Sequence, residues 1–152
     1  TDLDVLYVPI GLGSGLCGAL SARNALGLKT EIVGVVSSAA DAYALSFEQG
    51  KVVETGSANT LADGLAVRVP SASALALMRS GVSRIVRVSD AEVLTAIGWY
   101  YDDTHNLAEG AGAAALAALG IERERYAGQR AGVILSGANV DRTVLSAALN
   151  NH

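Results

Sequence analysis

Four short apolar runs are spaced along the sequence, and they show little of the polar–apolar alternation that a half-exposed strand has. Each run therefore predicts a strand that is buried on both faces. The four predicted strands are Val5–Ile10, Ile32–Val36, Ile85–Val88 and Gly132–Leu135.

Between and after these runs, apolar residues recur at helical spacing. Residues 89–101 open with Ser89 and Glu92, three positions apart, which is the pattern of a capping box at a helix start. A second helical stretch follows Pro70 and reaches Gly81, where a left-handed C-terminal cap is expected.

Three further segments favour helices. One runs from the glycines after the first strand to Arg23 and beyond, one is the small-residue stretch 109–120, and one follows the fourth strand. The alternation of strands and helices predicts an α/β fold with a parallel sheet covered by helices on both faces. Ligands of such sheets bind beyond the carboxyl ends of the strands. Those ends are followed here by Gly11–Ser14, Ser37–Asp41 and Ser136–Asn139.

Composition narrows the class of protein. The 152 residues suffice for one domain with a real core, and 51% of them are hydrophobic. No apolar run reaches the roughly 18 residues of a membrane span, so no membrane partner is expected. The net charge of −4 and the lack of a basic cluster argue against nucleic acid. A single cysteine, Cys17, excludes an internal disulfide, fits the cytoplasm and is expected to pack in the core.

The first predicted strand runs directly into a glycine-rich turn, Gly11-Leu12-Gly13-Ser14-Gly15, and then into a helix. Glycines let the backbone approach a ligand, and the free N–H groups of a helix N-terminus favour an anion such as a phosphate. The spacing matches neither the dinucleotide fingerprint nor the nucleoside-triphosphate loop. The alternative is a tight turn that only lets the helix pack closely on the sheet, and these residues alone leave both interpretations open.

A second glycine turn, in the segment VILSGANVD at residues 133–141, changes this picture. Together with VPIGLGSGLCG at 8–18, TLADGLAV at 60–67 and AEGAGAAALAAL at 108–119, it resembles the pyridoxal-phosphate-dependent threonine and serine dehydratases. These belong to fold type II, the tryptophan-synthase-β-like group. The four segments follow the family's order and spacing over essentially the whole chain. The resemblance implies the fold type II large domain, in part, and pyridoxal 5'-phosphate as cofactor.

The resemblance also implies roles for individual residues. The family's tetraglycine loop, which holds the cofactor phosphate, falls on Gly11, Leu12, Gly13 and Ser14. Side chains at Leu12 and Ser14 are tolerable if their φ angles stay negative. The hydroxyl that bonds to the pyridine nitrogen falls on Ser136. A neutral partner there leaves the ring a weaker electron sink, which suits β-elimination.

Two more residues match family positions beside the cofactor. Gly64 corresponds to a glycine whose backbone lies next to the cofactor ring. Glu109 corresponds to an acid that opens a helix near the cofactor and is expected to act in catalysis. The two residues after it, Gly110 and Ala111, depart from the family's Pro-Ser/Thr pattern, so this helix start is altered.

No metal site is expected. His105 beside Asp102 and Asp103 reads as part of a solvated loop, because one histidine among exposed acids seldom holds a metal. Some relatives bind a divalent cation through acidic residues after the second strand. Asp41 matches one of those ligands, but Val35 stands in the place of the leading carboxylate, so the site looks weakened or lost.

The family's Schiff-base lysine and its substrate-carboxylate loop are absent from the chain. Lys29 and Lys51, the only lysines, read as solvated turn residues. The resemblance therefore implies that residues 1–152 form the C-terminal part of a dehydratase catalytic domain and pair with the enzyme's own N-terminal half. Alone, the chain is expected to be inactive and prone to association. A homo-oligomer is expected for the intact enzyme.

For the intact enzyme the resemblance implies elimination of water from a small β-hydroxy amino acid, such as L-threonine or L-serine, to give a 2-oxo acid and ammonia in the cytoplasm. The alternatives within the family are an amino-acid racemase and a dehydratase of another 3-hydroxy amino acid. A non-enzymatic α/β domain that binds an anion or nucleotide is the alternative outside it.

Overall fold

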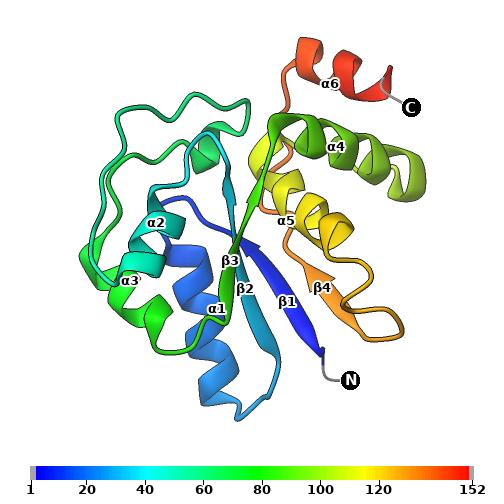
Figure 1. The fold of residues 1–152 in the computed structure, drawn as a ribbon. Coiled ribbons are helices and arrows are strands. Elements are labelled where there is room, and N and C mark those ends of the chain that lie inside the picture. Colours follow the sequence, from blue (N-terminus) through cyan, green and yellow to red (C-terminus); the bar gives the residue numbers. More distant parts are fainter. Residues whose placement is uncertain (1–2, 151–152) are drawn as a thin grey trace.

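The sheet has four parallel strands, which confirms the predicted fold class. The computed structural model describes residues 3–150. The strands are β1 (Val5–Pro9), β2 (Glu31–Ser37), β3 (Arg84–Val88) and β4 (Ala131–Val133), in the spatial order β3-β2-β1-β4 (Figure 1). Every pairing is parallel, so all four carboxyl ends lie at one edge of the sheet. The fourth strand ends at Val133, two residues before the predicted end at Leu135. Of the predicted residues, only Gly132 and Val133 pair with β1.

Helices cover both faces of the sheet. On one face lie α1 (Ser14–Ala25), α2 (Ala42–Gln49) and α3 (Ala72–Arg79) (Figure 1). On the other face α5 (Gly110–Ile121) packs against β1, β2 and β3, and α4 (Asp90–Thr104) packs on α5. The last helix, α6 (Arg142–Leu149), packs on α4. A long connection between α2 and α3 contains one turn of 3₁₀ helix, η1 (Asp63–Leu65).

Successive strand residues point to opposite faces, so the core is split into two clusters. Tyr7, Val33 and Val35 face α5, whose buried residues are all alanine or glycine. Small residues let the helix backbone approach the sheet closely. Val8 and Val36 face the other way and pack with Leu16 and Leu20 of α1 and Met78 of α3.

Of the two helix caps predicted from the sequence, one is confirmed and one is wrong. The capping box is confirmed, since Ser89 Oγ accepts from Glu92 N at 3.3 Å and Glu92 Oε2 accepts from Ser89 N at 2.7 Å. The left-handed cap at Gly81 is wrong, because α3 ends at Arg79 and Gly81 has no positive φ. A Cβ on Gly81 would lie 2.7 Å from Leu20 of α1, so this glycine serves close packing.

One helix was not predicted. The sequence analysis missed α2, which is only eight residues long and has no side-chain cap at its start. Cys17 packs against the second core cluster, as expected, although it is only half-buried, and its Sγ lies 3.7 Å from the carbonyl of Ala74. Burial raises the pKa of the Cys17 thiol. Among residues 3–150, no helix has the length and apolar character needed to cross a membrane.

Candidate functional site

The glycine turn after β1 has the conformation that the phosphate hypothesis requires. Gly13 has a φ of +100°, a left-handed value that favours glycine, and it immediately precedes α1. A Cβ there would also lie 2.9 Å from the Cβ of Ala74. Among the described residues, His105 is the one non-glycine with a positive φ, so Leu12 and Ser14 keep the negative φ that tolerates a side chain.

Free backbone donors follow this turn. The first backbone hydrogen bond of α1 runs from Cys17 N to Gly13 O at 2.9 Å, so the N–H groups of Ser14, Gly15 and Leu16 have no acceptor within the helix. No acidic residue occupies the first turn. With the helix dipole, these donors fit a phosphate.

Tyr43 fixes the turn from the side. Its hydroxyl donates to the carbonyl of Leu12 at 2.7 Å and accepts from Ser71 N at 3.0 Å. Because Tyr43 is buried, this geometry is tightly constrained, and burial raises the pKa of its hydroxyl. The turn is therefore tied to both α2 and the start of α3.

Close contacts between glycines join the four motif segments at the carboxyl edge of the sheet. A Cβ on Gly11 would lie 2.6 Å from the carbonyl oxygen of Gly64, and a Cβ on Gly64 would lie 2.8 Å from the Cβ of Ala111. In the first turn of α5, a Cβ on Gly112 would overlap the carbonyl oxygen of Gly137. The segments that are distant in sequence thus touch at glycines, where no room remains for a side chain.

Glu109 lies at this junction. Its N–H donates to the carbonyl of Gly137 at 3.0 Å, and its side chain packs so closely on Gly137 that a Cβ there would lie 2.6 Å from Cδ of the carboxylate. A cavity of about 490 Å³ opens beside it. Its lining includes Gly64, Glu109, Asp63, Asn139 and Asp141. The expected site residues Gly64 and Glu109 therefore share one cavity.

Ser136 lies beyond β4, next to Gly137. Tyr7 pairs with Val133, and Ile134 N donates to Tyr7 O at 3.1 Å, so the chain continues alongside β1 past the end of the assigned strand. Ser136 is exposed and does not line the 490 Å³ cavity.

The residues considered for a divalent cation do not suit one. Asp41 Oδ2 accepts from Arg87 Nε at 2.9 Å, and Glu48 Oε1 accepts from Arg87 Nη1 at 2.7 Å. Val35, in the place of the leading carboxylate, is fully buried in the core. Within residues 3–150, no three His, Cys, Asp or Glu side chains form a group that could hold a metal ion. His105 ends α4, with Nδ1 3.0 Å from the carbonyl of Tyr101.

Both lysines are exposed, as the sequence predicted. Lys29 lies just before β2, beside Asp4 and Arg130, at the amino edge of the sheet. This edge is opposite to the glycine turns, so Lys29 is remote from them. Lys51 follows α2.

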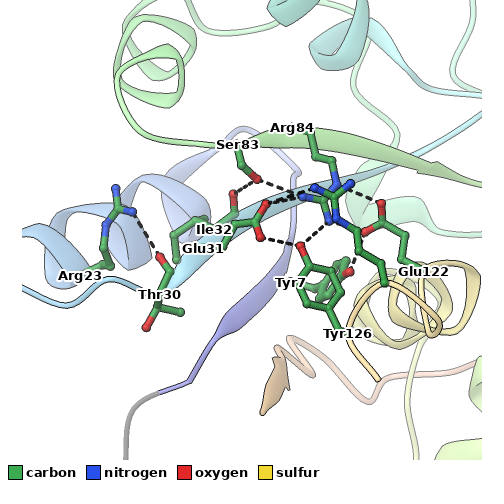
Figure 2. Close-up of polar contacts among 10 residues, drawn as sticks. Tyr7, Arg23, Thr30, Glu31, Ile32, Ser83, Arg84, Glu122 and Tyr126 are labelled. Atoms are coloured by element: carbon green, nitrogen blue, oxygen red, sulfur yellow. Dashed lines mark hydrogen bonds and ion pairs between the residues drawn. The ribbon is translucent and has the colours of Figure 1, made fainter. Parts of the chain in front are cut away.

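The amino edge carries a polar cluster that the sequence analysis missed (Figure 2). Arg84 donates to Glu31 at 2.5 Å, to Glu122 at 2.9 Å through Nε, and to the hydroxyl of Tyr126 at 2.9 Å. Tyr7 donates to Glu122 at 2.6 Å, and Tyr126 donates to Glu31 at 2.5 Å. We call these five side chains the Arg84 cluster. It joins β1, β2 and β3 to the chain after α5.

The charges in the Arg84 cluster shift its carboxylates toward the ionised form. Burial opposes this, but hydrogen bonds from Tyr126 and Arg84 and the charge of Arg84 outweigh it, so the pKa of Glu31 lies below its ordinary value. For Glu122, hydrogen bonds from Arg84 and Tyr7 similarly outweigh burial and lower its pKa. Burial and the neighbouring Glu122 raise the pKa of Tyr7.

Sequence reasoning also missed several residues around the glycine turns. Gly112 and Gly137 were parts of recognised motifs, but nothing in their local spacing showed that they touch. Thr60 and Asp90 meet through a hydrogen bond of 2.5 Å across 30 residues. Asp90 follows the capping residue Ser89 in the sequence, so a place in the first turn of the helix already accounted for it. Its contact with Thr60 could not be read from that position.

Comparison with known proteins agrees with this geometry. A family model described as pyridoxal-phosphate dependent enzyme matches residues 1–137. The chain is 38% identical over 141 residues to a phenylserine dehydratase of Ralstonia pickettii, a match that covers 91% of the chain and 43% of that protein. It is 34% identical over 145 residues to an L-threonine ammonia-lyase of Geobacter sulfurreducens, covering 95% of the chain and 36% of that protein.

A solved structure extends the match to three dimensions. The processed form of threonine deaminase isoform 2 from Solanum lycopersicum superimposes with a TM-score of 0.91 at 27% identity, over 99% of this chain and 45% of that one. The chain thus spans less than half the length of these three proteins. Four motif segments are joined by close contacts at the carboxyl edge of a parallel sheet. Since the family model also covers residues 1–137, the chain belongs to the pyridoxal-phosphate dependent enzymes of fold type II.

Proposed function

We propose that the chain is the cofactor-binding part of an enzyme that eliminates water from a β-hydroxy amino acid, such as L-threonine or L-serine, to give a 2-oxo acid and ammonia. The observation that carries the proposal is the junction of the Gly11, Gly64, Gly112 and Gly137 backbones at the carboxyl edge of the sheet. The names of the relatives, a phenylserine dehydratase and an L-threonine ammonia-lyase, support this class of reaction.

In this proposal the turn after β1 holds the cofactor phosphate. Backbone N–H groups of Gly11, Leu12, Gly13 and Ser14 donate to it, and the Ser14 hydroxyl adds a further donor. The left-handed φ of Gly13 and the free N–H groups at the start of α1 support this assignment. A phosphate there also complements the positive end of the helix dipole.

Ser136 and Gly64 would bind the rest of the cofactor. The Ser136 hydroxyl is the partner of the ring nitrogen, and the Gly64 backbone lies along the ring. Pyridoxal phosphate, when bound, supplies an electron sink for negative charge that develops at the α-carbon of the substrate. A hydroxyl partner keeps that sink weak, because it does not hold a proton on the ring nitrogen, and a weak sink favours elimination.

Glu109 would act in the cavity beside the cofactor. Its carboxylate packs on Gly137, adjacent to Ser136, and lines the cavity with Gly64. At that place it can orient a polar group of the substrate or accept a proton from it. The lysine that carries the cofactor and takes the α-proton would come from the enzyme's own N-terminal half. We further propose that the enzyme is cytoplasmic, which the single cysteine supports, and that it forms a homo-oligomer.

The test is Ser136→Ala in the full-length enzyme loaded with pyridoxal phosphate. We expect formation of 2-oxo acid from L-serine and L-threonine to fall about tenfold, the factor for one lost hydrogen bond of about 1.4 kcal/mol. Ser21→Ala is the matched control, because Ser21 is also exposed but lies about two turns into α1, away from the carboxyl ends of the strands. Wild-type turnover by Ser136→Ala would refute the assignment of Ser136. Release of D-serine without 2-oxo acid would point instead to a racemase.

A further inference from the structure

The segment that carries Gly64 has almost no regular structure of its own. Between the end of α2 at Gln49 and the start of α3 at Ala72, the one helical element is the single turn η1. This segment must nevertheless bring the Gly64 carbonyl against Gly11, where a Cβ would lie 2.6 Å from it. Something outside the segment has to hold it in that place.

Asp90 provides this hold. It is the first residue of α4, two positions after β3, and its side chain is hydrogen-bonded to the segment. Oδ1 accepts from the hydroxyl of Thr60 at 2.5 Å, and Oδ2 accepts from the N–H of Leu61 at 3.1 Å. Both carboxylate oxygens are thus used on two consecutive residues.

Thr60 links Asp90 to the next residues of the segment. While its hydroxyl donates to Asp90, its oxygen accepts from the N–H of Ala62 at 3.2 Å. Ala62 is fully buried, and its carbonyl accepts from the N–H of Leu65 at 2.8 Å to close the turn around Gly64. A continuous series of hydrogen bonds therefore runs from Asp90 to the residues on both sides of Gly64.

A carboxylate suits this place better than an amide. The Leu61 N–H can only donate, and the Thr60 hydroxyl donates to Asp90 while its oxygen accepts from Ala62 N, so residue 90 receives two hydrogen bonds. An asparagine has one acceptor oxygen and would face one of these donors with its own NH₂ group. The geometry also gives a charge-assisted hydrogen bond, which is stronger than a neutral one.

We propose that Asp90 is a positioning residue of the cofactor site, which acts through Thr60 to hold Gly64 against Gly11. This inference rests on the proposed function, because it treats Gly64 as part of the pyridoxal phosphate site. Asp90 touches neither substrate nor cofactor. Its effect reaches the site through the backbone of residues 60–64.

The experiment compares Asp90→Asn, Asp90→Ala and Ser89→Ala in the full-length enzyme. Ser89→Ala is the matched control, since it removes the capping box of the same helix without touching Thr60 or Leu61. We expect Asp90→Ala to raise the Kd for pyridoxal phosphate about tenfold or more, and Asp90→Asn by less. Ser89→Ala is expected to lower the thermal midpoint and to change this Kd by less than about twofold.

A second pair separates positioning from general stability. Thr60→Ser keeps the hydroxyl and should have the wild-type Kd for pyridoxal phosphate. Thr60→Val has the same shape without a donor and should raise this Kd as Asp90→Asn does. Amide hydrogen exchange at Leu61 and Ala62 should accelerate in Thr60→Val and Asp90→Asn in the apo enzyme, but not in Ser89→Ala. This readout needs no cofactor, so it stands if the proposed function fails.

The outcomes are distinct. If wild type does not bind pyridoxal phosphate, the proposed function fails. Separately, if amide exchange at Leu61 and Ala62 is the same in Thr60→Val and Asp90→Asn as in wild type, Asp90 does not hold this segment. If wild type binds it but Asp90→Ala and Asp90→Asn raise the Kd no more than Ser89→Ala does, Asp90 is only a helix-terminal residue and the inference is wrong. A Thr60→Ser variant as impaired as Thr60→Val would also overturn it.

Discussion

Replacing Gly112 with alanine should destabilise the protein, although the same change inside most helices is stabilising. Alanine in place of glycine in a helix interior usually gains about 1 kcal/mol, and less in the first turn, where Gly112 lies. Here the new Cβ would approach the Gly137 carbonyl oxygen to well under 3.0 Å, and it would also lie 3.1 Å from Gly137 N. No flexible side chain is present to give way, so the turn at Ser136 must move.

The magnitude follows from these two opposing effects. Overpacking of this kind costs about 1–3 kcal/mol, which exceeds the helical gain, so the net loss should be about 1–2 kcal/mol. Gly18→Ala is the matched control, because Gly18 lies inside α1 and a Cβ there has no neighbour within 4 Å. That variant should gain about 0.5–1 kcal/mol.

Thermal unfolding of the two variants and wild type, in the full-length apo protein, measures the difference. We expect the midpoint of Gly18→Ala to lie above wild type and that of Gly112→Ala below it. The Kd for pyridoxal phosphate should rise in Gly112→Ala alone, since the shifted carbonyl is adjacent to Ser136. If Gly112→Ala raised the midpoint as Gly18→Ala does, α5 and the Ser136 turn would not be packed as described.

Two further predictions concern charge. Because the folded pKa values of Glu31 and Glu122 lie below the ordinary 4.5, the Arg84 cluster stabilises the fold above that pH, and this contribution is lost as the pH falls through the lowered values. The thermal midpoint of wild type should therefore fall on acidification more steeply than that of Arg84→Met, and equal slopes would contradict the coupling. Second, neither EDTA nor Mg²⁺ should change the midpoint or the activity, because Arg87 already neutralises Asp41; stimulation by Mg²⁺ would refute that interpretation.

Patterns within a few residues predicted most of the fold. The strands β1, β2 and β3 were recognisable because strands buried on both faces read as continuous apolar runs. The capping box at Ser89 was recognisable because both partners lie within one turn. The short helix α2 has no side-chain cap at Asp41 and was missed. Gly81 was misjudged because its neighbours, Leu20 and Arg23, come from a helix about 60 residues earlier.

In the candidate site, too, the features set by neighbouring residues were predictable and the contacts between distant residues were not. The motifs identified the turn at Gly13, and its left-handed φ follows from residue type and position. The contact of Gly112 with Gly137, and the hold of Asp90 on Thr60, depend on how the chain is wound in space. No periodicity records such pairs, because each residue also satisfies a local role in its own helix or turn.

The order of the strands has a consequence for synthesis. The first strand, β1, lies inside the sheet, and Val5 pairs with Ala131, which is made 126 residues later. At ribosomal speeds this delay is roughly 6 to 25 s. During that interval β1 can pair with β2 but has an open side toward the future β4. Because the Ser136 turn follows β4, the nascent chain cannot place this turn beside β1 until β4 has paired with it. If Ser136 binds pyridoxal phosphate as proposed, loading with the cofactor should therefore follow the pairing of β4 with β1.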